Sequence, residues 1–233
     1  MFKYNTPVVF LPLFIFLTCP PVFALSTISN PTEQVEKIQN LYQQLTSLCF
    51  DFSQITRSGS RNREGRGNAV FYRPGGNKPG VMRWNYTAPD SQVILNDGKT
   101  LSIYTRNDRQ VIITSAEELQ SDITSAFFSG TRNLLDDFIP QPPDNRFVFR
   151  ADKQKLQTVQ LVPRKPHAQI KTIHLWFTDD FVIQHLILED HFDSVTELTF
   201  SNIKLNSLPV HSAKTLRSIV QLDLPPDTEI IRQ

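Results

Sequence analysis

The segment GNAVFYRPGGNKPGVMRWNYTAPDSQVILNDGKTLSIY, residues 67–104, consists of short runs in which apolar and polar side chains alternate. Turn-forming residues separate the runs, and the last turn is Asn96-Asp97-Gly98. A period of two predicts β-strands, and a glycine-containing turn between two such runs predicts a hairpin. The segment therefore predicts a meander of four antiparallel strands, which collects large apolar groups on one face and must bury that face.

The residues before this meander predict a helix and a first strand. Asn30 suits the N-cap, Pro31 suits the first helical position, and apolar side chains then recur at helical spacing over residues 31–46. Residues 50–54 alternate as a strand, and the polar residues 57–68 are expected to form a hairpin tip. The apolar stripe of the helix has two interpretations, because it either completes a core or covers a lipid cavity.

The residues after the meander predict helices and then a second group of strands. A strand is expected at 108–114, a helix from the capping box at Ser115 to Gly130, and a second short helix at 131–138. Alternating runs then predict strands that are connected closely enough to be antiparallel neighbours. These runs are residues 146–151, 156–162, 168–178, 181–189 and 194–204.

The first 24 residues differ from the rest of the chain. Lys3 precedes the apolar residues 8–17, and Ala24 is a small residue suited to cleavage. This pattern predicts a signal peptide at 1–24 that is cleaved near Ala24, followed by a single exported domain at 25–233. The apolar run is shorter than a membrane span, which disfavours the alternative of an uncleaved anchor.

Cysteine and charge usage restrict the possible sites and partners. Lipidation of Cys19 is a disfavoured alternative, because Thr18 and Pro20 fit that modification poorly. After cleavage Cys49 is the one cysteine left, so no intramolecular disulfide can form, and its apolar neighbours predict a buried, inert thiol. Cleavage also removes Lys3 and leaves 23 basic and 23 acidic residues, with no basic run, so nucleic acid is not expected as a partner.

Signatures of catalysis do not occur in the sequence. It has no Gly-x-Ser-x-Gly, no His-Glu-x-x-His, no phosphate-binding glycine loop and no dinucleotide motif. The five histidines are scattered; His174 and His185 are on neighbouring predicted strands, but two histidines alone do not predict a metal site. We therefore expect no enzyme, no metal and no cofactor. A hydrolase remains the alternative if polar groups converge inside the fold.

Several residues of the meander carry a recognisable combination of motifs. They are Gly67, Arg73-Pro74, Arg83-Trp84-Asn85-Tyr86, Pro89, Gln92, and Asn96-Asp97-Gly98-Lys99-Thr100-Leu101 followed by Tyr104. In this spacing they resemble the signature of the periplasmic lipoprotein-carrier family, LolA. Fainter similarity covers most of the mature chain, and residues 220–227 resemble the closing strand and Pro-Pro turn of that family.

The resemblance implies a fold and a function. The fold would be α+β: an unclosed, curved antiparallel β-barrel of about ten or eleven strands, with the N-terminal helix and the helices at 115–138 as its lid. The protein would be a monomeric periplasmic chaperone that binds the acyl chains of lipid-modified proteins. It would accept them from an inner-membrane lipoprotein-releasing ABC transporter and deliver them to an outer-membrane lipoprotein receptor. The alternative is a receptor-type or other lipid-binding or lipid-sensing protein on the same fold, and lipidated Cys19 would favour the receptor.

The expected binding residues are the large apolar side chains of the predicted sheet and lid, including some of the 17 phenylalanines of the chain. The acyl-chain cavity and lid would be formed by Leu41, Tyr42, Leu45, Phe50, Phe52, Met82, Trp84, Tyr86, Leu101, Ile103, Leu119, Ile123 and Phe127. Each methylene group removed from water contributes about 0.8 kcal/mol. A carrier that must release several acyl chains therefore needs an empty state whose free energy is close to that of the loaded state.

In the LolA family an arginine latches the lid when the carrier is empty, and the resemblance offers two positions for it. Counting forward from Gly67 places the latch at Arg73, whereas counting back from Trp84 places it at Lys78. The difference arises because residues 74–78 are extra in this chain. We favour Arg73, since the planar guanidinium can bond two helix carbonyls. The family's lid leucine aligns with Tyr42, or with Leu41 after a shift of one residue.

Overall fold

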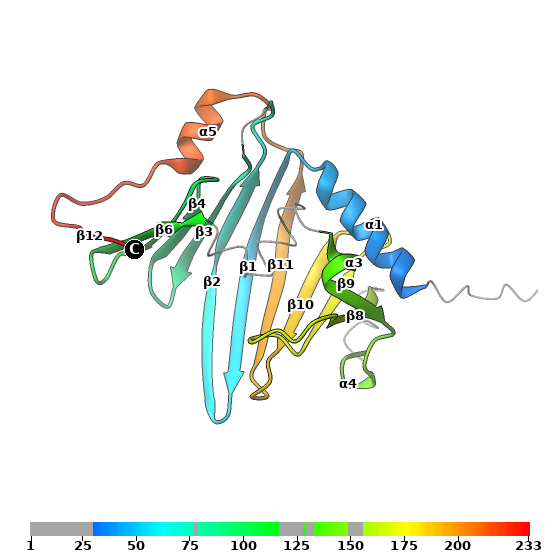
Figure 1. The fold of residues 1–233 in the computed structure, drawn as a ribbon. Coiled ribbons are helices and arrows are strands. Elements are labelled where there is room, and N and C mark those ends of the chain that lie inside the picture. The colour runs from blue at the N-terminus through cyan, green and yellow to red at the C-terminus, as the bar shows by residue number, and fades with distance from the viewer. Residues whose placement is uncertain (1–29, 77–78, 117–127, 129–132, 149–155) are drawn as a thin grey trace, which may run out of the picture.

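The computed structural model describes residues 30–76, 79–116, 128, 133–148 and 156–233, and their strands form one sheet (Figure 1). The predicted signal peptide and the predicted site residues Lys78, Leu119, Ile123 and Phe127 lie outside these residues. The strands are β1 (Ser47–Ser58), β2 (Arg61–Tyr72), β3 (Val81–Ala88), β4 (Gln92–Asn96), β5 (Thr100–Thr105), β6 (Gln110–Ser115), β7 (Phe138–Gln141), β8 (Gln157–Pro163), β9 (Thr172–Phe177), β10 (Ile183–Glu189), β11 (Val195–Leu205) and β12 (Glu229–Arg232). The helices are α1 (Pro31–Gln44), α3 (Leu134–Asp137), α4 (Asn145–Val148) and α5 (Ala213–Val220).

The sheet is open, because β12 and β7 lie at its two ends. Its order is β12-β6-β5-β4-β3-β2-β1-β11-β10-β9-β8-β7, so β1 and β11 join two meanders. The strand pairs are antiparallel except β12, which lies parallel to β6. The predicted fold class is confirmed, with twelve strands in the described residues where ten or eleven were expected.

The quoted segment forms the meander that its pattern predicts. It contains the end of β2 and all of β3, β4 and β5, each paired antiparallel with the next. The turn before β5 has Gly98 at φ +90°, a conformation that favours glycine. The N–H of Gly98 donates to Asn96 Oδ1 (2.8 Å), and the N–H of Thr100 donates to Asp97 Oδ1 (2.8 Å). The side-chain oxygens of Asn96 and Asp97 therefore close the hairpin.

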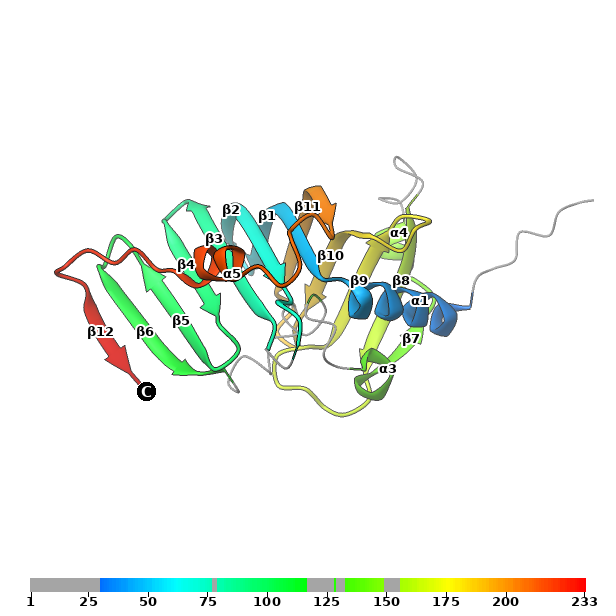
Figure 2. The same ribbon diagram turned by 90° about the horizontal axis from the view of Figure 1, so that it is seen from above.

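The alternation of side chains gives the sheet two different faces. On one face, which we call the inner face, Phe50, Ala69, Trp84, Ile94 and Ile103 follow one another across β1 to β5. Helix α1 packs on this face against β7 and β8, and Figure 2 shows it along the half of the sheet that contains β8 and β9. On the opposite, outer face α5 packs against β3.

Helix α1 begins and packs as its sequence predicts. The N–H of Thr32 donates to Asn30 Oδ1 (3.0 Å), and Pro31 occupies the first helical position. The side chains of Val35 and Ile38 are buried against the sheet. The helix ends at Gln44, two residues before the predicted end.

Three predictions of local structure were wrong. The predicted helix at 131–138 is only the short α3 within its described part, and strand β7 follows at once; β7 tolerates Pro140 because it is an edge strand. The described part of the predicted strand 146–151 is helix α4 instead. The expected closing strand at the start of residues 220–227 does not form, since Val220 ends α5 and residues 221–224 are irregular. A turn does form where the Pro-Pro turn was expected, with the N–H of Thr228 donating to the carbonyl oxygen of Pro225 (3.1 Å), and β12 follows it and pairs with β6.

Two further details differ from the sequence interpretation. Most of the predicted hairpin tip 57–68 is strand, because every residue from Arg61 to Tyr72 has a partner on β1. Cys49 is a free thiol that is partly exposed, since it alternates away from the buried Leu48 and Phe50. No helix in the described part of the chain is long and apolar enough to cross a membrane.

Candidate functional site

A cluster of aromatic rings forms the centre of the inner face. Phe52 of β1 lies 4.8 Å from Trp84 and 4.9 Å from Tyr86, measured between ring centroids. Phe50 lies 5.4 Å from Trp84 and 5.0 Å from Phe200 of β11. These edge-to-face contacts are favourable and form a wide apolar surface across three strands.

Phe128 is inserted into this cluster from the connection between β6 and α3. Its side chain is only 2% exposed. Its ring centroid lies 5.1 Å from that of Phe50, 5.2 Å from Phe200, 5.9 Å from Tyr42 and 6.1 Å from Trp84. One phenylalanine therefore occupies the space between the sheet and α1.

The sequence interpretation missed Phe128. Helical spacing from Leu119 and Ile123 selected its neighbour Phe127 instead, and those three residues lie outside the described ones. The signal that was available is the Phe127-Phe128 pair, which places a second ring next to the one that helical spacing selected.

Most of the described residues that were predicted to form the cavity do lie together. Phe50, Phe52, Met82 and Trp84 belong to the core of the inner face, and so do Tyr42 and Leu45 from the α1 end. Leu41 and Tyr86 are partly buried against it. Leu101 and Ile103 share the inner face through β5, but they lie beyond β4 and are not members of this core cluster.

Tyr42 connects α1 to the sheet by a buried hydrogen bond. Its hydroxyl oxygen accepts from the N–H of Ile183 on β10 (3.1 Å). The pairing register of β10 with β9 shifts just after Ile183, between Ile183 and His185. Burial raises the pKa of Tyr42 far above its ordinary range, so the phenol stays neutral.

Removing the Tyr42 hydroxyl should weaken the attachment of α1. In Tyr42→Phe the buried N–H of Ile183 loses this acceptor, and an unsatisfied buried donor costs about 1–3 kcal/mol. We expect the free energy of unfolding, measured in urea, to fall by about this amount, and amide exchange in α1 to accelerate. Unchanged exchange in α1 would show that the bond does not hold the helix.

Arg73 binds the end of α1. Its Nη1 donates to the carbonyl oxygens of Gln43 (2.5 Å) and Leu45 (2.7 Å), and its guanidinium stacks over the ring of Phe71 at 5.1 Å. The side chain is partly buried, which lowers its pKa. A cation at a helix C-terminus is favourable, because the last carbonyl groups there lack partners within the helix.

Arg83 makes the corresponding contacts on the outer face. Its Nη1 donates to the carbonyl oxygens of Ile219 (3.0 Å) and Gln221 (2.6 Å) at the end of α5. Its pKa is lowered by burial, although the charge of Asp223 acts in the opposite direction. The described residues therefore include two partly buried arginines that each bind the C-terminus of a helix, one on each face of the sheet.

A polar cluster lies under α4 on the outer face. Glu189 accepts from Thr172 Oγ1 (2.6 Å) and pairs with Arg146 (3.2 Å), while His174 Nε2 lies 3.5 Å from its carboxylate. The ring of Phe147 covers His174 at 4.3 Å. Across the described ranges no group of three or more His, Cys, Asp or Glu is arranged to hold a metal ion.

This cluster should make the protein less stable in mild acid. Burial is the main cause that lowers the pKa of His174, so the folded state favours the neutral ring. Because the folded pKa lies below the unfolded one, stability decreases as the pH falls through the unfolded value of about 6.5. The free energy of unfolding should be lower at about pH 5.5 than at about pH 7.5, and His174→Phe should reduce the difference.

A second loss of stability should follow at lower pH. Burial acts to raise the pKa of Glu189, but the hydrogen bond from Thr172 and the charge of Arg146 outweigh it, so the pKa is lowered. A depressed carboxyl pKa stabilises the fold above the unfolded value of about 4.5, and this contribution is lost below it. His174→Phe should keep this second loss of stability while it reduces the first one, which occurs between about pH 7.5 and pH 5.5. If the variant had the same pH profile as the wild type, the first loss would not come from His174.

Comparison with known proteins supplies relatives across most of the chain. The family described as "Outer membrane lipoprotein carrier protein LolA" matches residues 43–213. An outer-membrane lipoprotein carrier protein of Nitrosomonas europaea is 27% identical over 174 residues, which cover 74% of this chain and 79% of that protein. Another, from Legionella pneumophila, is 26% identical over 220 residues, covering 94% of this chain and 98% of that protein.

A solved structure supports the fold independently of sequence. An uncharacterized conserved protein from Thermus thermophilus superposes with a TM-score of 0.53 at 9% identity. The match covers 87% of this chain and 98% of that one. At this identity the similarity establishes the shared architecture only.

Proposed function

Because the chain belongs to the LolA family of outer membrane lipoprotein carrier proteins, we propose that it binds the acyl chains of lipid-modified proteins and carries them across the periplasm. It would accept them from an inner-membrane lipoprotein-releasing ABC transporter and deliver them to an outer-membrane lipoprotein receptor. It would act as a monomer, without catalysis or cofactor. It would be exported by a signal peptide cleaved near Ala24, leaving one domain at 25–233.

The observation that carries this proposal is the aromatic inner face with Phe128 and α1 upon it. A hydrocarbon chain placed on these rings would gain about 0.8 kcal/mol for each methylene group removed from water. To reach the rings it would have to displace Phe128 and the buried side chains of α1, such as Tyr42. The net affinity for an acyl chain is then the free energy gained by burying the chain minus the free energy lost on displacing these side chains. A small difference suits a carrier that must also release its cargo.

In this proposal Arg73 sets the balance between the two states. It favours the closed state because its guanidinium bonds Gln43 and Leu45 at the end of α1. Opening of α1 would break these bonds, so they oppose loading and assist release. Lys78, which lies outside the described residues, is the other proposed latch.

Transfer of a lipoprotein tests the proposal directly. Proteoliposomes that contain the ABC transporter and a triacylated lipoprotein are incubated with ATP and the mature protein, and the lipoprotein is then measured in the supernatant after ultracentrifugation. We expect a soluble complex that passes its cargo to receptor-containing liposomes. An unacylated lipoprotein is the control and should not form the complex. Lipoprotein that stays in the membrane, with folded carrier present, would refute the proposal.

Mass spectrometry of the mature N-terminus tests the export prediction. A chain that begins near Leu25 agrees with the soluble carrier. A diacylglycerol on Cys19 would instead favour the receptor-type function.

A further inference from the structure

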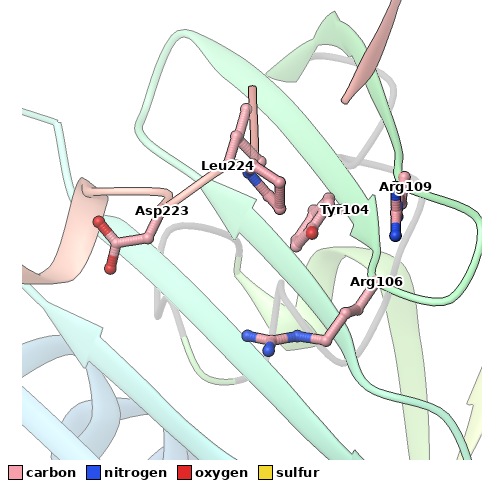
Figure 3. Close-up of a pocket in the computed structure, with 6 residues that line it drawn as sticks. Tyr104, Arg106, Arg109, Asp223 and Leu224 are labelled. Carbon is pink, nitrogen blue, oxygen red and sulfur yellow. The ribbon is translucent and has the colours of Figure 1, made fainter. Parts of the chain in front are cut away.

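A polar pocket lies on the outer face, between the β5–β6 turn and the segment that connects α5 to β12. It has a volume of about 450 Å³, within the range usual for ligand sites, and Figure 3 shows its lining residues. The residues are Tyr104, Arg106, Arg109, Asp223, Leu224 and Pro225. Because Tyr104 alternates with Ile103 along β5, the pocket and the aromatic cluster of the inner face lie on opposite faces of the sheet.

The polar and charged side chains of the pocket differ in whether they have an interaction partner. Arg109 forms an ion pair with Asp227, and Asp223 accepts a hydrogen bond from Gln221 Nε2 (2.8 Å). Arg106 differs, because its exposed guanidinium has no hydrogen-bond or ion-pair partner in the described part of the chain. The hydroxyl of Tyr104 likewise has no partner there, although the residue is only 4% exposed.

The unpaired guanidinium of Arg106 lies in the same pocket as an apolar wall. Figure 3 shows the ring of Tyr104 between Leu224 on one side and Arg106 on the other, while the carboxylate of Asp223 points away from the ring. Arginine binds carboxylates and phosphates through a planar fork of donors. The pocket thus offers an anion site next to a surface for a small apolar group.

The surrounding charges select the kind of anion. Arg109 is paired with Asp227, and the charge of Asp223 acts on Arg83, so Arg106 carries the one uncompensated charge among the described residues of the pocket. The single charge of a carboxylate matches this one free guanidinium, whereas a doubly charged phosphate would exceed it. We propose that this pocket binds a carboxylate attached to a small apolar group, with Arg106 as its cation, Tyr104 as hydroxyl donor and Leu224 as its apolar wall.

Titration followed by NMR tests the site on the whole mature protein. The Nε–Hε signals of arginine side chains are followed while sodium benzoate is added at constant ionic strength. We expect a saturable shift of the Arg106 signal and a smaller response to phenyl phosphate. Benzamide, the neutral analogue, should produce no saturable shift. Arg106→Gln should weaken benzoate binding at least tenfold, and Arg106→Lys should weaken it less.

A matched control is Arg66→Gln, since Arg66 is an exposed arginine on β2, away from the pocket. This variant should bind benzoate like the wild type. N-acetyl-prolyl-leucine and its amide distinguish the source of the carboxylate. Tighter binding of the peptide acid than of benzoate would identify a protein terminus, and tighter binding of benzoate would identify a free organic acid. Equal benzoate binding by wild type and Arg106→Gln, or no saturable shift, would overturn the proposal.

Discussion

Arg73→Leu should hold lipoprotein more tightly than the wild type and should fail to pass it to the receptor. The substitution removes the two hydrogen bonds to Gln43 and Leu45, which in the proposed mechanism form only in the closed, empty state. Hydrogen bonds to a charged group are worth about 1.5–3 kcal/mol each, and partial exposure of this arginine reduces that contribution. A net loss of about 2 kcal/mol would raise the affinity for acyl chains roughly 30-fold.

The measurement is the fraction of cargo that moves from a preformed soluble complex to receptor-containing liposomes. Arg83→Leu is the matched control, because Arg83 binds the end of α5 in the same way but on the outer face. It should lose comparable stability and still deliver its cargo. If Lys78→Leu retained cargo and Arg73→Leu delivered it normally, the latch would be Lys78.

The parts of this fold that could be predicted are those that depend on local pattern. The alternation of Met82, Trp84 and Tyr86 predicts both a strand and the face that becomes buried, and the structure confirms both. The N-cap at Asn30 similarly predicts where α1 begins. In each case neighbouring residues along the chain carry the information.

The parts that were wrong depend on pairing partners and not on the pattern within a segment. Strand β12 exists because Ile230 and Ile231 pair in parallel with Val111 and Ile112, about half the chain away. The polar residues after Ser58 are strand because β1 offers them a pairing edge, and that overrides their turn-like composition. The local alternation of apolar and polar residues predicts neither the pairing of β12 with β6 nor the pairing of the polar part of β2 with β1.

The site shows the same division. Phe50, Phe52 and Trp84 could be assigned to one face from alternation alone. The bonds from Arg73 to the end of α1 could be expected only through the family resemblance, since the two partners are about 30 residues apart. Phe128 escaped both approaches, because its neighbours along the chain do not identify which of two adjacent rings turns toward the sheet.

Phe128→Ala should bind acyl chains more tightly although its empty form is less stable. The ring is 2% exposed and touches four other aromatic rings, and removal of such a side chain typically costs about 3–5 kcal/mol. If an acyl chain takes the place of this ring, the substitution removes packing energy from the empty state but not from the loaded state. The affinity for a chain should then rise at least about tenfold, which corresponds to only about 1.4 kcal/mol of that difference.

The two tryptophans of the chain allow the measurement to be confined to the site. Trp84 lies 6.1 Å from Phe128, whereas Trp176 is on the outer face beside His185, so a Trp176→Phe background leaves Trp84 as the reporter. Binding of a dansylated fatty acid is followed by energy transfer from Trp84. Tyr72→Ala is the control, because it removes a fully buried ring from the outer-face core and should lose stability without gaining affinity. If Phe128→Ala also lost stability without gaining affinity, Phe128 would be an ordinary core residue and the acyl chain would have to bind elsewhere.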